Sequence, residues 1–180
     1  KYAIDATLAI PVAHFNHVVI DTFPTHLSLT DNRLTVVTDT IRKKLNHKKA
    51  DNVIDVLDVG CGKGRFINAM HILHPDALSI TGTDISIDML RMAKSRKYVT
   101  SPTAIMPKYV KSAATSLPFP DNSFDIVYMV ESMEHVLFVN ATLRECHRIL
   151  KNNGVLHVID KTTDDVHQRS TLWELEKWEK

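Results

Sequence analysis

Short apolar runs alternate with amphipathic stretches from about residue 53 onward. Five runs, at about 53–59, 78–83, 108–112, 124–130 and 154–160, are shorter than typical helices, and most are rich in β-branched residues. This pattern favours buried strands of a parallel sheet. Helical spacing marks 65–73 and 86–97, and a further helix precedes the last run. Strands interleaved with helices predict an α/β fold with a doubly wound, mostly parallel sheet and right-handed crossovers.

The first fifty residues carry helical patterns only. We predict short helices at 2–10 and 14–20, a loop around Pro24 and a longer helix at 33–46. The longer helix places its large apolar residues on one face: Leu34, Val37, Ile41 and Leu45. We therefore divide the chain into a leading helical segment, 1–50, and a core, 51–180, within a single domain. A last helical pattern covers 172–180.

The composition fits a globular domain and weakens several functional classes. Of 180 residues, 44% are apolar, and 22 basic against 21 acidic residues leave a formal charge of +1. This balance gives no electrostatic reason to expect a nucleic-acid partner. Two cysteines form no disulfide framework, and no apolar run reaches the roughly 18 residues of a membrane span. We expect a cytoplasmic protein without a membrane partner, and we leave a homodimer open.

Ten histidines raise the question of a metal site. His14 with His17, and His71 with His74, are i, i+3 pairs that would lie close on a helix face. Neither pair has a third ligand in a recognisable pattern, so we expect no metal.

The most informative segment is the turn after the first predicted strand, where Gly60, Gly62 and Gly64 alternate with other residues. Glycines permit backbone torsions that a Cβ would forbid, and they let a ligand approach the main chain closely. The turn opens the 65–73 helix, whose first N–H groups favour negative charge. We interpret Cys61, inside the turn, as a small residue tolerated beside a ligand and not as a nucleophile.

The glycine spacing and the preceding acid argue against a dinucleotide. A dinucleotide fold uses G-x-G-x-x-G, whereas the third glycine here comes one residue early. Asp58 stands just before the turn, where a carboxylate repels a diphosphate but attracts an amine. The alternative is a tight strand–helix turn that binds no ligand.

A second acid, Asp84, ends the second predicted strand. It lies 24 residues after Gly60, close to the spacing at which a carboxylate binds ribose hydroxyls. A carboxylate suits this role because it accepts two hydrogen bonds from a cis-diol. The alternative role of Asp84 is to cap the next helix, but Ser86 is the better cap candidate, so we favour the ribose role.

Three further motifs follow. Residues 116–130 read Ser-Leu-Pro-Phe-Pro-Asp-Asn-Ser-Phe-Asp-Ile-Val-Tyr-Met-Val, 131–136 read Glu-Ser-Met-Glu-His-Val, and 148–154 read Arg-Ile-Leu-Lys-Asn-Asn-Gly. With the glycine turn, they resemble the class I S-adenosylmethionine-dependent methyltransferases, in their small-molecule, type 11-like branch. The resemblance spans about 51–160. It implies a Rossmann-like sheet of order 3-2-1-4-5 with N-terminal helices over the cofactor. The family's closing hairpin is missing from this sequence, so we expect the natural protein to be longer.

The resemblance also implies where the cofactor, S-adenosylmethionine, would lie. Its ammonium and carboxylate suit Asp58 and the N–H groups of the turn, its ribose suits Asp84, and its adenine would pack on Ile85. The residues expected to bind it are Asp58, Gly60, Cys61, Gly62, Gly64, Asp84, Ile85, Ala113, Ala114 and Glu131.

Ala113 is a departure from the family pattern. The family commonly places an acid there to contact the adenine amine, so one hydrogen bond worth about 0.5–1.5 kcal/mol is lost. Main-chain groups of Ala113 and Ala114, or the Ser112 hydroxyl, would substitute for it.

The resemblance implies methyl transfer to O, N or C of a small-molecule metabolite, for which positioning of the acceptor matters most. A hydroxyl acceptor needs a base, and His135 is the first candidate and Asp160 the second. A structural role for His135 stays open. The alternatives are a protein or RNA methyltransferase, whose usual Pro-Pro motif after the fourth strand is absent, and a non-catalytic binding module.

Overall fold

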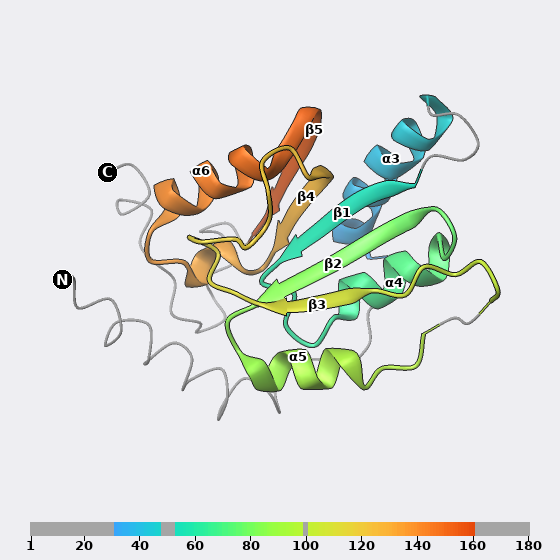
Figure 1. The fold of residues 1–180 in the computed structure, drawn as a ribbon, viewed down its shortest axis with the longest axis horizontal. Helices are drawn as coiled ribbons and strands as arrows, with labels where there is room; N and C mark the ends of the chain where they lie inside the picture. The colour runs from blue at the N-terminus through green and yellow to red at the C-terminus, as the bar shows by residue number, and fades with distance from the viewer. Residues whose placement is uncertain (1–30, 48–52, 99–100, 161–180) are drawn as a thin grey trace.

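The computed structural model describes residues 31–47, 53–98 and 101–160 (Figure 1). The helices predicted at 2–10, 14–20 and 172–180 lie outside these residues. The elements in chain order are α3 (Asn32–His47), β1 (Ile54–Val59), α4 (Arg65–Leu73), β2 (Leu78–Asp84), α5 (Ile87–Lys94), β3 (Lys108–Lys111), β4 (Phe124–Val130), the 3-10 turn η2 (Met133–His135), α6 (Val139–Ile149) and β5 (Leu150–Ile159).

The five strands form one parallel sheet in the order β3-β2-β1-β4-β5, which confirms the predicted order. Figure 1 shows their arrowheads pointing toward the same edge. The chain leaves β1 for β2 on one side and returns to β4 on the other. Ligands of such doubly wound sheets bind at this reversal, beyond the carboxyl ends of the two strands.

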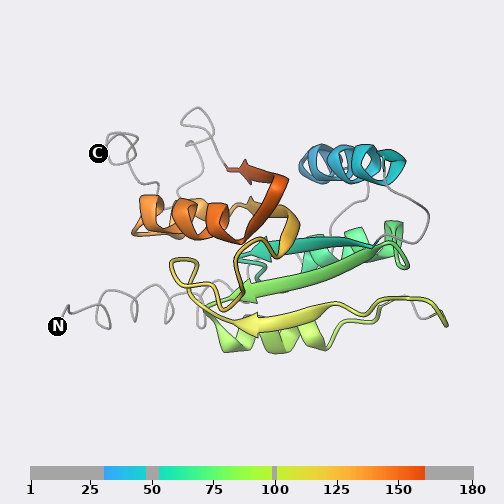
Figure 2. The ribbon, with the colours of Figure 1, turned by 45° about the horizontal axis from the view of Figure 1, so that its top comes forward.

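Helices cover both faces of the sheet. Apolar residues of α3, α4 and α5 pack on one face, against strand residues such as Val56 and Ile126. The other face, with Leu57 and Val127, packs against α6. Figure 2 shows α5 and α6 on opposite sides of the sheet. Every residue of β4 is buried, which explains why the strand is apolar apart from Asp125 and the Tyr128 hydroxyl.

The longer N-terminal helix forms as predicted. Leu34, Val37 and Ile41 are buried in the same core as β1, and Leu45 packs at its border. These positions follow helical spacing, so one apolar stripe faces the sheet. The division of the chain at residue 50 stays a prediction.

The start of β5 differs from the prediction. We predicted that the last strand begins at about residue 154, but β5 follows α6 directly at Leu150. Leu150 pairs with Phe124, and the register then shifts so that Val155 pairs with Ile126. The extra residues bulge out, and Asn153 takes a φ of +63°, a left-handed conformation that asparagine tolerates.

Candidate cofactor site

The turn after β1 holds its three glycines in left-handed backbone conformation, with φ of +77° at Gly60, +51° at Gly62 and +69° at Gly64. A Cβ added at Gly60 would lie 2.6 Å from the Ser132 Cβ, and one at Gly64 would lie 2.8 Å from the Tyr109 hydroxyl. At Gly62, no heavy atom of the described chain comes within 4 Å of that position. Packing therefore requires the outer glycines, whereas Gly62 faces open space that a ligand can occupy.

The main-chain N–H groups of this turn mostly hold it in shape. Those of Gly60 and Cys61 both donate to the Thr83 carbonyl at 2.8 Å, which ties the turn to β2. Gly62 donates to Oδ2 of Asp84, also at 2.8 Å. Cofactor contacts of Gly60 and Cys61, which stay predictions, would therefore use atoms other than these N–H groups.

Asp84 ends β2, directly beside the turn. Its Oδ1 accepts the N–H of Ser86 and its Oδ2 that of Gly62, each at 2.8 Å. Burial raises the pKa of this carboxyl above its usual value, and the N–H donors oppose the rise. Ser86 caps α5, because its hydroxyl accepts the Met89 N–H at 3.3 Å. Ser86, and not Asp84, is therefore the cap of α5. The ribose role of Asp84 stays a prediction.

Asp58 lies near the end of β1 with its carboxyl inside the protein. It is 2% exposed, and the strand register sets it opposite Tyr128 of β4. Neither Oδ2 of Asp58 nor the Tyr128 hydroxyl has a hydrogen-bond partner among the described residues. Burial raises the pKa of Asp58 to about 8, although the nearby Tyr128 hydroxyl opposes this rise. A buried carboxyl without a partner gains strongly from a cationic ligand.

Cys61 is buried next to these acids. Burial, followed by the charges of Asp58 and Asp84, raises the pKa of its thiol well above the usual value. Because the thiolate is the reactive form of cysteine, this thiol is a poor nucleophile. Its sulfur instead packs against β2, 2.8 Å from where a Cβ at Gly82 would lie. The raised pKa agrees with the interpretation that Cys61 is not a nucleophile, and its contact with a ligand stays a prediction.

The expected adenine contacts lie beyond the ends of β2 and β3. Ile85 and Ala113 are half-buried, and Ala114 packs against the core on the α6 face. The Ser112 hydroxyl, which we expected to substitute for the absent acid, donates to the Ala113 carbonyl at 3.1 Å. The hydroxyl oxygen keeps lone pairs with which it could still accept a hydrogen bond from the adenine amine, so this contact stays a prediction.

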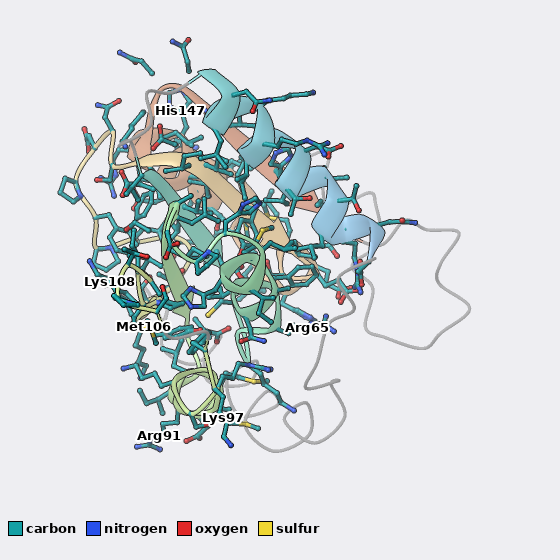
Figure 3. The ribbon with its side chains drawn as sticks, turned by 90° about the vertical axis from the view of Figure 1, so that its right-hand side faces the viewer. Arg65, Arg91, Lys97, Met106, Lys108 and His147 are labelled. Carbon is teal, nitrogen blue, oxygen red and sulfur yellow. The ribbon has the colours of Figure 1, made fainter. Side chains whose placement is uncertain are left out.

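Glu131 directly follows β4 and has a left-handed φ of +50°. Its Oε1 lies 2.6 Å from a guanidinium nitrogen of Arg33, and its Oε2 lies 2.7 Å from one of Arg65. Figure 3 labels Arg65 close to the first turn of α3, where Arg33 is located. Both carboxylate oxygens of this predicted cofactor contact are thus already paired with arginines.

The two candidate bases lie next to each other. His135 is in η2, with its Nε2 3.5 Å from Oε1 of the buried Glu134. Asp160, just after β5, accepts the Glu134 N–H at 3.1 Å and so fixes the path of this turn. The described residues contain no group of three or more potential metal ligands.

Three residues of this edge escaped the sequence prediction: Arg33, Arg65 and Tyr128. Tyr128 carried a detectable signal, because it is a polar side chain in an otherwise apolar part of a buried strand. The arginines carried none, because their common partner is far away in the sequence.

The glycine turn, the buried Asp58 and Asp84 therefore meet at one edge of a 3-2-1-4-5 sheet. A model of the family described as a methyltransferase domain matches residues 57–158, more than half of the chain. This chain belongs to that family. The match confirms the predicted place among class I S-adenosylmethionine-dependent methyltransferases, and it implies S-adenosylmethionine as the cofactor.

Curated relatives of the methyltransferase domain include enzymes named for quinone and sterol chemistry. A 2-methyl-6-phytyl-1,4-hydroquinone methyltransferase of Synechocystis is 34% identical over 121 residues, covering 66% of this chain and 36% of the relative. A demethylmenaquinone methyltransferase of Bacteroides fragilis is 32% identical over 125 residues, covering 69% and 50%. A sterol 24-C-methyltransferase of Gibberella zeae is 30% identical over 118 residues, covering 65% and 30%. The chain thus spans half or less of the length of these relatives.

Solved structures show the same fold. The PH0226 protein of Pyrococcus horikoshii is 27% identical with a TM-score of 0.57, covering 84% of this chain and 69% of that one. The YcgJ protein of Bacillus subtilis is 26% identical with a TM-score of 0.54, covering 72% and 54%. The [4+2]-cyclase SpnF is also 26% identical, with a TM-score of 0.53, covering 76% and 48%.

The residues present fit S-adenosylmethionine. Asp58 would offer to the ammonium a buried carboxyl whose Oδ2 has no partner among the described residues, and the space at Gly62 would let the methionine half approach the main chain. Each carboxylate oxygen of Asp84 accepts one N–H and has a further lone pair that could accept a ribose hydroxyl.

Proposed function

We propose that this domain transfers the methyl group of S-adenosylmethionine to O, N or C of a small-molecule metabolite. The observation that carries the proposal is the buried carboxyl of Asp58, whose Oδ2 has no hydrogen-bond partner among the described residues. It lies beside the open side of Gly62 and one strand from Asp84. An ammonium next to a cis-diol meets both acids, with charge-assisted hydrogen bonds to each.

S-adenosylmethionine, when bound, would supply a methyl group on a positively charged sulfur to an electron pair of the acceptor (a lone pair of O or N, or the π electrons of a carbon nucleophile), and the electrons of the broken carbon–sulfur bond would stay on sulfur. Because the sulfonium charge is neutralised, the protein mainly holds the two reactants in line and close. Asp58, Asp84 and the glycine turn would fix the donor. The acceptor would approach from the side of η2, which follows β4.

A hydroxyl acceptor also has to lose a proton. His135 is the residue that we propose to take it, because it is half-buried in η2 and a histidine accepts protons near neutral pH. Glu134 would orient the ring, and Asp160 would shape the turn through the Glu134 N–H. For a nitrogen or carbon acceptor, His135→Asn should slow transfer much less.

The names of the relatives favour an apolar ring acceptor, such as a quinol or a sterol. We propose a small-molecule substrate, a cytoplasmic location and no nucleic-acid partner, and we leave a homodimer open. None of the described helices is long and apolar enough to cross a membrane.

The first test is calorimetric titration with S-adenosylmethionine and S-adenosylhomocysteine. The second is a transfer assay with methyl-labelled cofactor over quinol and sterol pools, with RNA and protein as separate arms. We expect binding and label in the small-molecule arm. Label in RNA or protein alone would establish the macromolecular alternative.

A non-catalytic or differently acting module is the second alternative. The fold is shared with a protein described as a [4+2]-cyclase, so the fold does not by itself establish methyl transfer. Cofactor binding without any labelled product, in any arm, would favour this alternative.

A further inference from the structure

Four charged residues alternate in sign along the edge where α3, α4 and β4 meet. Asp31 accepts from Arg33 through both oxygens, at 2.9 and 2.5 Å. Arg33 pairs with Glu131 at 2.6 Å, and Glu131 pairs with Arg65 at 2.7 Å. Both guanidinium groups lie over the Phe66 ring, 5.5 and 5.4 Å from its centroid. We call these four charged residues the charge chain; Glu131 is the anion that its two cations share.

The charge chain connects both ends of the glycine turn. Arg65 is the first residue of α4 and follows Gly64 directly. At the other end, Ser132 packs against Gly60 and donates its hydroxyl to the Val59 carbonyl at 2.9 Å. The left-handed φ of Glu131 directs the chain into this contact. Glu131 therefore holds the start of α4 through its side chain, and its backbone conformation places Ser132 over the start of the turn.

Resting on the proposed function, we infer that Glu131 is a positioning residue of the cofactor site. It does not contact the cofactor. It holds the first turns of α3 and α4 around the glycine turn by neutralising Arg33 and Arg65 together.

This role predicts unequal effects of removing its partners. Without the carboxylate, two guanidinium groups face each other over Phe66, and their repulsion acts on the start of α4. Without Arg33, the pair between Glu131 and Arg65 survives. Removing Arg33 in addition to the carboxylate relieves the repulsion, so the second change repairs part of the first.

The experiment measures dissociation constants for S-adenosylhomocysteine in the wild type, Glu131→Gln, Arg33→Met and the double variant, with thermal unfolding of each. We expect binding to weaken about tenfold in Glu131→Gln and at most about threefold in Arg33→Met. The double variant should bind more tightly than Glu131→Gln. If the double variant weakens binding by the product of the two single-variant factors, the inference is overturned.

A second ligand separates positioning from direct contact. 5′-Methylthioadenosine lacks the amino-acid half of the cofactor. A displaced turn should weaken both ligands by similar factors in Glu131→Gln. A direct contact with the ammonium would weaken S-adenosylhomocysteine alone, which would contradict the inference.

The matched control is Arg42→Met, on the same helix. Arg42 forms an exposed pair with Asp39 at 2.5 Å and lies in the middle of α3. Its loss should leave both affinities unchanged.

If Glu131→Gln does not fold, Arg65→Met cuts the same pair from the other side. Positioning then predicts weaker binding of both ligands, and unchanged binding contradicts it. A folded wild type that binds neither ligand refutes the proposed function itself, whereas normal wild-type binding with multiplying losses refutes only this inference.

Discussion

The strands of the sheet begin at one edge, here called the amino edge, and end at the other, the carboxyl edge, and the two edges differ in how one buried acid is paired. At the amino edge, Lys151 lies 2.6 Å from Asp55 and 2.9 Å from Asp125, and Asp125 also accepts the Asp55 N–H. At the carboxyl edge, Asp58 is buried without a hydrogen-bond partner for its Oδ2 among the described residues. The acids of the amino edge are satisfied by the protein itself, whereas Asp58 is left for something else.

Backbone strain also differs between the two edges. The carboxyl edge carries left-handed φ at the three glycines and at Glu131, a residue for which this conformation is unfavourable. The amino-edge loops carry Asn122 and Asn153, which tolerate it. Strain and an unpaired buried acid concentrated at one edge indicate a binding site there, and a structural role for the other edge.

The largest effect is expected for Gly60→Ala. The new Cβ meets Ser132 at 2.6 Å on a φ of +77°, so we predict a loss of about 2–5 kcal/mol of stability and no measurable cofactor binding. The control is Gly62→Ala, whose Cβ meets no described atom and should cost about 1 kcal/mol. Chemical denaturation and calorimetry measure both. Equal stability losses would show that Ser132 does not constrain the turn.

Asp58→Asn should separate binding from stability. Removing the charge should weaken S-adenosylhomocysteine about ten- to hundredfold, because a charged hydrogen bond is lost. Stability should change by less than about 1 kcal/mol, because the raised pKa of Asp58 keeps the carboxyl largely neutral in the free protein at pH 7. Calorimetry measures the loss of affinity, and urea unfolding measures the change in stability. Wild-type affinity in this variant would exclude Asp58 as the ammonium's partner.

The pKa of Asp58 also predicts a pH dependence. Since the ammonium needs the ionised carboxyl, affinity should rise by up to about tenfold per pH unit from pH 6 to 8. The contribution of Asp58 to folding stability changes in the opposite direction and falls as the pH rises. The folded state holds this proton more tightly, so that contribution is fully present below pH 3.8 and is lost as pH rises through about 8. Titrations across this range should show the slope in the wild type and its absence in Asp58→Asn.

The smallest effect on binding is expected at the amino edge. Asp125→Asn weakens the contacts to Lys151 and to the Asp55 N–H, which should cost about 1–2 kcal/mol of stability. Cofactor affinity, measured by calorimetry, should remain that of the wild type. A loss of affinity comparable to that of Asp58→Asn would mean that the two edges are not functionally distinct.

The sequence predicted the elements whose signals are local. The buried strands, the glycine turn and the Ser86 cap follow from apolar runs, backbone freedom and side-chain hydrogen bonding, and they form where expected. The start of β5 was missed because pairing of Leu150 with Phe124 extends the strand past residues that favour a turn.

The electrostatics of the site could not be predicted in the same way. Asp58 lies opposite Tyr128 because of the register between two strands that are distant in the sequence. The pairing of Glu131 with Arg33 and Arg65 depends on how two helices dock on the sheet. Such contacts arise only from the tertiary fold, so composition and spacing carry no record of them.

The most direct test of the account is a calorimetric titration of the protein with S-adenosylhomocysteine at pH 7, in two buffers of different ionisation enthalpy. The account predicts saturable binding accompanied by proton release, as the ligand's ammonium forces Asp58 to ionise. A folded protein that gives no binding heat at millimolar ligand, or that binds without any proton release, would contradict it.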